Sequence, residues 1–159
     1  MEEKFFLNWV INEKIAIGKA PNKIENLIFL KENGIKSIFS LCDEKDFPDS
    51  KYLKNNFHHI RKTLPDHRYK RVITLDEISD SLQIIDNLLE KKPLYIHCLF
   101  AMERSPVICI AYLIKSKNLG LLEALSYLKQ IHPLTNPSNI QLNSIRDLRL
   151  NLKNHETKN

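Results

Sequence analysis

The most constraining feature of the chain is a short loop between an apolar strand and an apolar helix. Residues Leu94–His97 form an apolar segment of strand length, and a long apolar run begins at Pro106. Between them, Cys98 and Arg104 stand six positions apart. A loop of this length can turn its backbone N–H groups toward an oxyanion, while the following helix directs its positive dipole end at the same point. The segment therefore predicts a phosphate-binding catalytic loop.

Two side chains of this loop suit reaction with a phosphate ester. The guanidinium of Arg104 stays charged and can bind two phosphoryl oxygens at once. The same positive surroundings favour the thiolate form of Cys98, which is the nucleophilic form. Neither Cys42 nor Cys109 has an arginine at the same offset, so the pattern is specific to one of the three cysteines. The alternative is a buried strand-end cysteine beside an unrelated surface arginine.

The pair His97-Cys98, followed by Arg104-Ser105, resembles the cysteine-dependent protein tyrosine phosphatase superfamily and, within it, the compact dual-specificity phosphatases. The resemblance covers the chain from about Lys14 to Ile145. It implies that Cys98 forms a phosphocysteine intermediate and that Arg104 binds the phosphate and the transition state. It also implies that the Ser105 hydroxyl assists breakdown of the intermediate.

The rest of the loop is expected to bind the substrate phosphate. Its members are His97, Leu99, Phe100, Ala101, Met102, Glu103 and Arg104. The family usually has glycine at the position of Ala101, often preceded by alanine at the position of Phe100. A sharp bend around an anion often needs a positive φ angle, which glycine adopts freely and alanine does not. Either the loop accommodates Ala101, or affinity and rate are reduced.

A phosphatase of this type also needs a proton donor for the leaving oxygen. The candidate is Asp66, which lies in the polar, turn-like segment Leu64–Arg68, 32 residues before Cys98. The family has its general acid at a similar interval and in a similar loop. The alternative is a Pro-Asp turn whose carboxylate bonds its own backbone. Carboxylates further along, in Thr74–Glu77, fit the pattern of a capping box that opens a helix.

The remaining histidines and cysteines add two open alternatives. His97 either orients the loop or packs at the end of the strand, and its position beside Cys98 favours the first interpretation. The other histidines have no metal-ligand spacing, so we expect no metal and no other cofactor. Cys109 is expected in the core. Cys42 could approach the edge of the site, and the open alternative there is a regulatory disulfide.

The hydrophobic pattern predicts an α/β fold. Strands are expected at 5–11, 14–17, 37–42, 58–64 and 94–97, and helices at 22–33, 50–56, 75–91, 121–131 and 139–152, with a buried helix after Pro106. The helical crossover before the last strand is long enough to place it parallel to an earlier strand, with its C-terminal end where ligands bind. We therefore expect a single central, mostly parallel sheet of about four to five strands flanked by helices, as the resemblance to phosphotyrosine phosphatases also implies.

Length and composition indicate the number of domains and the cellular compartment. The 159 residues suit one catalytic domain over 1–152, followed by a polar tail over 153–159. An odd number of cysteines without framework spacing argues for a reducing compartment. The N-terminus lacks the pattern of a signal peptide, and no stretch approaches bilayer length. We expect a soluble, cytoplasmic monomer that does not engage a membrane.

The net charge of +5 would attract anionic ligands. Basic residues gather near the proposed acid and past the catalytic helix, where they form either a rim for phosphorylated substrates or a merely solvated surface. They are Arg61, Lys62, Arg68, Lys70, Arg71, Lys115 and Lys117. We expect a phosphorylated protein or a small aryl phosphate as the partner. Nucleic acid is not expected, because no binding motif accompanies the charge.

The function predicted from these features is hydrolysis of phosphotyrosine, and also of phosphoserine or phosphothreonine, in proteins. Three alternatives stay open. One is a catalytically weak phosphate-binding module. Another is a phosphatase that acts on a non-protein phosphate, such as an inositol phosphate or an RNA 5′ end. The third is a rhodanese-type sulfur-transfer domain, which has less use for Asp66 as an acid.

Overall fold

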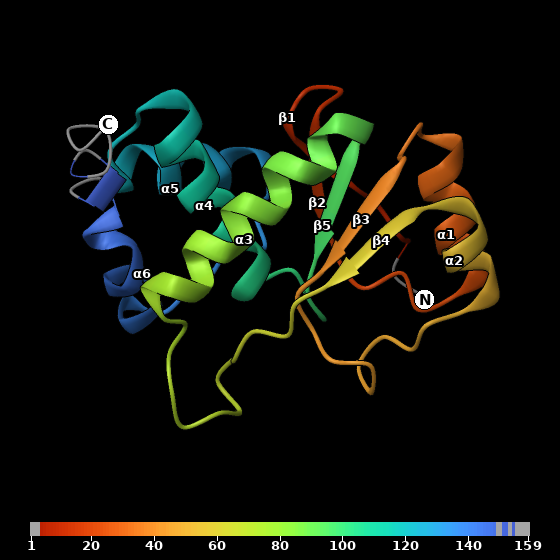
Figure 1. The fold of residues 1–159 in the computed structure, drawn as a ribbon, viewed down its shortest axis with the longest axis horizontal. Helices are drawn as coiled ribbons and strands as arrows, with labels where there is room; N and C mark the ends of the chain where they lie inside the picture. Colours follow the sequence, from red (N-terminus) through yellow and green to blue (C-terminus); the bar gives the residue numbers. More distant parts are fainter. Residues whose placement is uncertain (1–3, 149–150, 153, 155–159) are drawn as a thin grey trace.

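A computed structural model describes residues 4–148, 151, 152 and 154. Its centre is a five-stranded sheet of strand order β1-β2-β5-β3-β4 (Figure 1). The strands are β1 (Asn8–Ile11), β2 (Ile15–Gly18), β3 (Ser37–Ser40), β4 (His58–Arg61) and β5 (Leu94–His97). The predicted polar tail lies outside the described residues, apart from residue 154.

The sheet is mostly parallel, as predicted. Strands β1 and β2 form an antiparallel hairpin, whereas β5 pairs in parallel with β2 on one side and with β3 on the other. Strand β4 adds in parallel to the free edge of β3. The central position of β5 explains why all four of its residues are buried. Its C-terminal end delivers the loop that begins at Cys98.

Side-chain alternation along the strands builds two cores, one on each face of the sheet. Ile15 and Ile96 contribute to one buried cluster, and their neighbours Ala16 and Tyr95 contribute to the other. Helices α1 (Ile24–Glu32) and α2 (Lys51–Asn56) lie on the second face. The first face is covered by the remaining helices (Figure 1). They are α3 (Leu75–Leu88), α4 (Arg104–Lys117), α5 (Leu121–Ile131) and α6 (Asn139–Arg146), with a short 3-10 turn, η1 (Leu89–Lys91), after α3.

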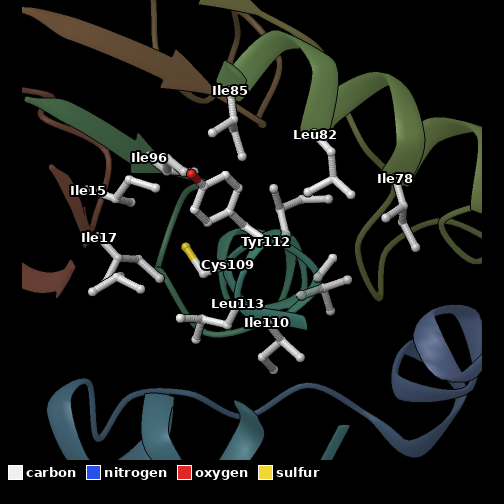
Figure 2. Packing of buried hydrophobic residues seen from close by; sticks show 14 of the residues in the cluster. Ile15, Ile17, Ile78, Leu82, Ile85, Ile96, Cys109, Ile110, Tyr112 and Leu113 are labelled. Carbon is white, nitrogen blue, oxygen red and sulfur yellow. The ribbon is translucent and has the colours of Figure 1, made fainter. Parts of the chain in front are cut away.

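Helix α4 lies at the centre of the larger core. Its residues from Arg104 to Ile114 are all buried. Figure 2 shows Cys109 and Tyr112 projecting from this helix among side chains of the sheet and of α3, including Ile96 and Ile85. A helix that is apolar nearly all round has to be buried in this way. The packing fixes the N-terminal end of α4, and with it Arg104, against the end of β5.

Local signals set the ends of the helices. The predicted capping box is present at α3, where Thr74 Oγ1 accepts from the Glu77 N–H and the Glu77 carboxylate accepts from the Thr74 N–H. Gly34, with φ of 84°, follows the end of α1. The predicted helix over 139–152 is described as α6 as far as Arg146, and the remaining stretch includes residues outside the description. None of the described helices has the length and apolar character needed to span a bilayer.

Candidate active site

The predicted site residues come from three separate parts of the chain and meet at one pocket. Cys98 follows β5, Arg104 opens α4, and Asp66 lies in the long connection between β4 and α3, drawn yellow-green in Figure 1. All three line a pocket of about 120 Å³. The other lining residues are His67, Phe100, Met102, Glu103 and Asn136. We refer to it as the catalytic pocket.

Cys98 lines the catalytic pocket and is buried, with 3% of the residue exposed. Its Sγ is 3.3 Å from the hydroxyl Oγ of Ser105, which is itself fully buried. A hydroxyl at this distance can donate a hydrogen bond to the sulfur. The contact brings together the two residues predicted to form and to break down an intermediate.

Arg104 is buried and held in one orientation. Its Nη1 donates to the carbonyl oxygens of Leu41 and Leu64, each at 3.4 Å. Its Nε is a buried donor that finds no hydrogen-bond partner in the described part of the chain. An unpaired buried donor is costly, and this one lies on a residue that lines the catalytic pocket. The arrangement suits an oxyanion bound beside the guanidinium.

Asp66 is a buried carboxylate held between two arginines. Its Oδ2 is 3.1 Å from Nη2 of Arg104 and accepts from Nε of Arg68 at 2.9 Å. The Arg68 backbone N–H also donates to its Oδ1 at 2.9 Å, so the predicted Pro-Asp turn geometry is present as well. Burial alone would raise the pKa of Asp66, but the hydrogen bonds from Arg68 and the charge of Arg104 outweigh it and lower this pKa below its usual range.

A second carboxylate, Asp46, extends this cluster and was not identified from the sequence. Its Oδ2 accepts from Nη2 of Arg68 at 2.5 Å and lies 4.0 Å from Nη2 of Arg104. Hydrogen bonds from Arg68 lower the pKa of Asp46. Arg68 is therefore a bridge between two acids, and not simply part of a solvated basic rim. The segment between β3 and α2 that carries Asp46 gives no local signal for this role, because the contact spans 22 residues.

Ala101 has the positive φ that glycine would supply at this point of the loop. Its φ is 59°, and it is fully buried. The carbonyl of Ala101 accepts from Nε2 of His132 at 2.7 Å, and Nδ1 of that ring accepts from the Asn8 side-chain amide at 2.8 Å. Because a carbonyl can only accept, the proton of His132 lies on Nε2. Burial lowers the pKa of His132, which keeps the ring neutral, as this chain of hydrogen bonds requires. No role was predicted for His132 from the sequence.

His97 does not line the catalytic pocket but contacts the backbone of the loop. Its Nδ1 donates to the Cys98 carbonyl at 2.9 Å, and its Nε2 accepts from the Ser40 hydroxyl at 2.7 Å. The Ser40 oxygen in turn accepts from Nε2 of His59 at 2.8 Å. Complete burial lowers the pKa of His97 to about 3, so the ring is neutral at physiological pH. This geometry favours the interpretation in which His97 orients the loop.

The other loop residues divide between core and rim. Leu99 is partly buried and packs against the cluster on the α1 side of the sheet. Phe100 and Met102 are exposed at the mouth of the catalytic pocket. Glu103 ties the loop to the β4–α3 connection, because its Oε2 lies 3.0 Å from Nδ1 of His67.

The two other cysteines are free, buried thiols. Burial raises the pKa of Cys42 to about 11 and raises that of Cys109 still further. A thiol with a raised pKa is a poor nucleophile in disulfide exchange. The raised pKa values of these two thiols therefore give no support to the regulatory disulfide considered from the sequence.

The sequence matches the model of a known protein family. Residues 16–149 match the family model described as the dual specificity phosphatase catalytic domain. The chain is 38% identical over 60 residues to dual specificity protein phosphatase 5 of Homo sapiens, a match that covers 37% of this chain and 16% of that protein. It is 25% identical over 126 residues to dual specificity protein phosphatase 18 of Bos taurus, which covers 79% of this chain and 62% of the relative. The chain thus spans less than two thirds of the length of both relatives.

Solved structures show the same fold. The crystal structure of PTPMT1 superposes with a TM-score of 0.81 and 19% sequence identity, covering 97% of this chain and 100% of that chain. PTPMT1 has also been solved in complex with PI(5)P. At this level of identity the likeness concerns the arrangement of the sheet and helices.

Proposed function

The chain belongs to the family of dual specificity phosphatase catalytic domains, and on that premise we propose that it is a cysteine-dependent phosphoric monoester hydrolase. Its substrates are phosphotyrosine, and also phosphoserine or phosphothreonine, in proteins. One observation carries the proposal. Cys98, Arg104 and Asp66, from three separate segments, line the same small pocket. A nucleophile, an anion-binding cation and a carboxylic acid in one pocket are the groups that this reaction needs.

In the first step the Cys98 thiolate attacks phosphorus in line with the ester oxygen. The S–P bond forms as the P–O bond to the leaving group breaks, and Asp66 transfers its proton to the departing oxygen. Arg104 and the backbone N–H groups of the loop stabilise the negative charge on the three equatorial oxygens. The orphaned Nε of Arg104 supports this placement of the phosphate.

In the second step water attacks the phosphocysteine. Asp66, now a carboxylate, accepts a proton from the water, and inorganic phosphate forms as the S–P bond breaks. The electron pair returns to the sulfur of Cys98. The Ser105 hydroxyl, 3.3 Å from that sulfur, stabilises the departing thiolate by a hydrogen bond.

The charge state of Asp66 depends on what Arg104 binds. Pairing with Arg104 and Arg68 favours the ionised form. A phosphate dianion bound to Arg104 would take over part of that positive charge and place negative charge beside the carboxylate. A like charge nearby disfavours ionisation. Substrate binding therefore promotes the protonated form of Asp66 that the first step requires.

The backbone at Ala101 bears on the alternative of a weak phosphate-binding module. That alternative rests on distortion of the loop by alanine. Ala101 nevertheless adopts φ of 59°, and the hydrogen bond from His132 supports this conformation. The strain of a left-handed alanine is on the order of 1–2 kcal/mol, which a buried network can offset. The observation favours an enzyme over a binding module.

The proposal is tested by hydrolysis of an aryl phosphate. We expect the parent chain to be active and to be inhibited by vanadate, and the Cys98→Ser variant to be inactive. Cys109→Ala is the matched control, because it removes another buried thiol from the core and not from the catalytic pocket. An active Cys98→Ser variant would contradict the mechanism. A parent chain that binds phosphotyrosine without hydrolysing it would instead support the binding module.

A further inference from the structure

A second pocket adjoins the catalytic pocket. It has a volume of about 320 Å³ and lies between the β4–α3 connection and the start of α6. The two pockets share three lining residues, Asp66, His67 and Glu103. The contact between His67 and Glu103 therefore lies at the boundary between them. We call the second pocket the flanking groove.

The flanking groove exposes apolar side chains. Tyr69, Val72 and Ile140 line it, and each is more than 40% exposed. Phe100 and Met102 are exposed at the adjoining catalytic pocket. Of the ten large apolar side chains that are exposed in the described chain, five thus surround these two pockets. Exposed apolar side chains that gather in this way mark a binding surface, whereas scattered ones do not.

The flanking groove also carries one available cation. Most basic residues that were predicted around the acid loop are neutralised within the described chain: Arg61 pairs with Asp49, Lys62 with Asp80, Arg68 with Asp46 and Asp66, and Arg71 with Glu77. Lys70 is exposed, lines the groove and has no carboxylate partner among the described residues. An anionic group in this groove would meet Lys70.

We infer that the flanking groove is a specificity subsite for the polypeptide next to the phosphorylated residue, and that it selects an apolar side chain together with an acidic one. The inference rests on the proposed function, because it requires a phosphorylated residue in the catalytic pocket. The apolar side chain contacts Tyr69, Val72 and Ile140, and the acidic one pairs with Lys70. An extended polypeptide advances about 3.3 Å per residue, so residues close in sequence to the phosphorylated one can reach an adjoining groove.

The charges disfavour a phosphoinositide in the same place. A headgroup with further phosphates needs several cations around it. The flanking groove offers Lys70, while Arg71 is occupied by Glu77 and the boundary carries the carboxylate of Glu103. A single acidic side chain flanked by an apolar one fits this balance better.

The test compares kcat/KM for phosphotyrosine peptides with that for p-nitrophenyl phosphate, which has no flanking residues. One peptide series carries leucine and glutamate at successive positions on either side of the phosphotyrosine. Matched series replace the leucine by serine or the glutamate by lysine. We expect the best leucine and glutamate peptide to exceed its matched serine and lysine peptides by about threefold to tenfold each. Vesicles that contain PI(5)P form a separate arm.

Variants assign the effect to the groove. Lys70→Glu should reverse the charge preference, so that the lysine peptide becomes the better substrate. Ile140→Asp should abolish the preference for leucine over serine. Leu122→Asp is the control for Ile140, because both residues are second in their helices and are 76% and 63% exposed. Lys36→Glu is the control for Lys70, since Lys36 is exposed and precedes β3 at the opposite end of the sheet. Both controls should keep the parent preferences.

The outcomes separate this inference from the proposed function. Hydrolysis of p-nitrophenyl phosphate without any flank preference would overturn the subsite and leave the phosphatase standing. A preference that survives Lys70→Glu and Ile140→Asp would also overturn it. Preferred hydrolysis of PI(5)P in vesicles that is lost in Lys70→Glu would assign the groove to a lipid headgroup instead. No hydrolysis of any substrate would remove the proposed function and the subsite with it.

Discussion

Arg104 and Asp66 form a buried ion pair, in which Nη2 of the arginine lies 3.1 Å from Oδ2 of the aspartate. The residue proposed to bind phosphate and the residue proposed to donate the proton are therefore in contact with each other. Only 3% and 6% of their side chains are exposed, so the pair is shielded from solvent. A phosphate that binds Arg104 has to compete with this carboxylate, which couples substrate binding to the position and charge of the acid.

Asp66→Asn removes the proton donor while keeping a side chain of similar size. We expect kcat to fall by about 10²- to 10⁴-fold on an aryl phosphate with a poor leaving group, such as phenyl phosphate. The loss on p-nitrophenyl phosphate should be much smaller, because its leaving group departs without a proton. Steady-state kinetics on a series of substituted phenyl phosphates measures this difference. Equal losses across the series would remove Asp66 from its role as the acid.

Arg68→Gln should move the descending limb of the pH–rate profile to higher pH. The first chemical step needs protonated Asp66, so activity falls as this group ionises. Hydrogen bonds and charge from Arg68 lower the pKa of Asp66, and their removal raises it. Activity should therefore persist to higher pH in the variant, measured as kcat/KM on phenyl phosphate.

Arg71→Gln is the matched control for this shift. Arg71 lies on the same connection and pairs with Glu77, so it does not contact the acid. The descending limb of the pH–rate profile of Arg71→Gln should coincide with that of the parent. A limb that moves equally in both variants would point to a general electrostatic effect, and one that moves in neither would contradict the contribution of Arg68.

Much of the fold could be predicted from local pattern. The strand at 94–97 and the helix at 121–131 have the predicted bounds, because each combines a clear hydrophobic pattern with a glycine or proline at its start. The strands predicted at 37–42 and 58–64 are shorter, since β3 ends at Ser40 and β4 at Arg61. Beyond the ends of these strands, the backbone carbonyls of Leu41 and Leu64 accept hydrogen bonds from Arg104. These two contacts with Arg104 span 63 and 40 residues, so no local signal in the sequence announces them.

In the site too, features set by neighbours in the sequence could be predicted, and contacts across the fold could not. Cys98, Arg104 and Ser105 are close in sequence, so their spacing alone indicates a shared loop. The supporting residues come from elsewhere: Asp46 reaches Arg68 across 22 residues, and Asn8 reaches His132 across 124. A positive φ at Ala101 could be expected from the bend, but the ring that stabilises it could not, because proximity in space is set by how α5 returns to the loop.

His132→Ala should weaken both the fold and phosphate binding. It leaves the buried carbonyl of Ala101 without its donor, which costs about 1–3 kcal/mol. It also releases a backbone that is held at positive φ, so KM for an aryl phosphate should rise. His132→Gln places an amide donor near the position of Nε2 and should restore part of both losses. Urea unfolding and steady-state kinetics measure the two effects. If KM is unchanged in a folded His132→Ala variant, this ring does not position the loop.

Acid should destabilise the fold through its buried histidines well before the carboxylates titrate. The pKa of His97 is about 3 in the folded chain against 6.5 in the reference state, because burial disfavours the charged ring. The unfolded chain therefore binds a proton between these two values that the folded chain does not. The contribution of His97 to the free energy of unfolding is therefore complete above pH 6.5. It falls as the pH drops below this value, with a slope that approaches about 1.4 kcal/mol per pH unit for one proton.

The pKa values of His132 and His59 are lowered by burial as well, so their contributions have the same sign. Between pH 6 and pH 5, the unfolding free energy from urea titrations should fall less steeply in His97→Asn than in the parent, by about one bound proton. Asparagine can donate to the Cys98 carbonyl near the position of Nδ1 without titrating. His132→Gln applies the same test to a second ring if His97→Asn does not fold. Slopes that match the parent in both variants would show that these rings take up protons in the folded chain, and would contradict the neutral rings that accept hydrogen bonds from Ser40 and Asn8.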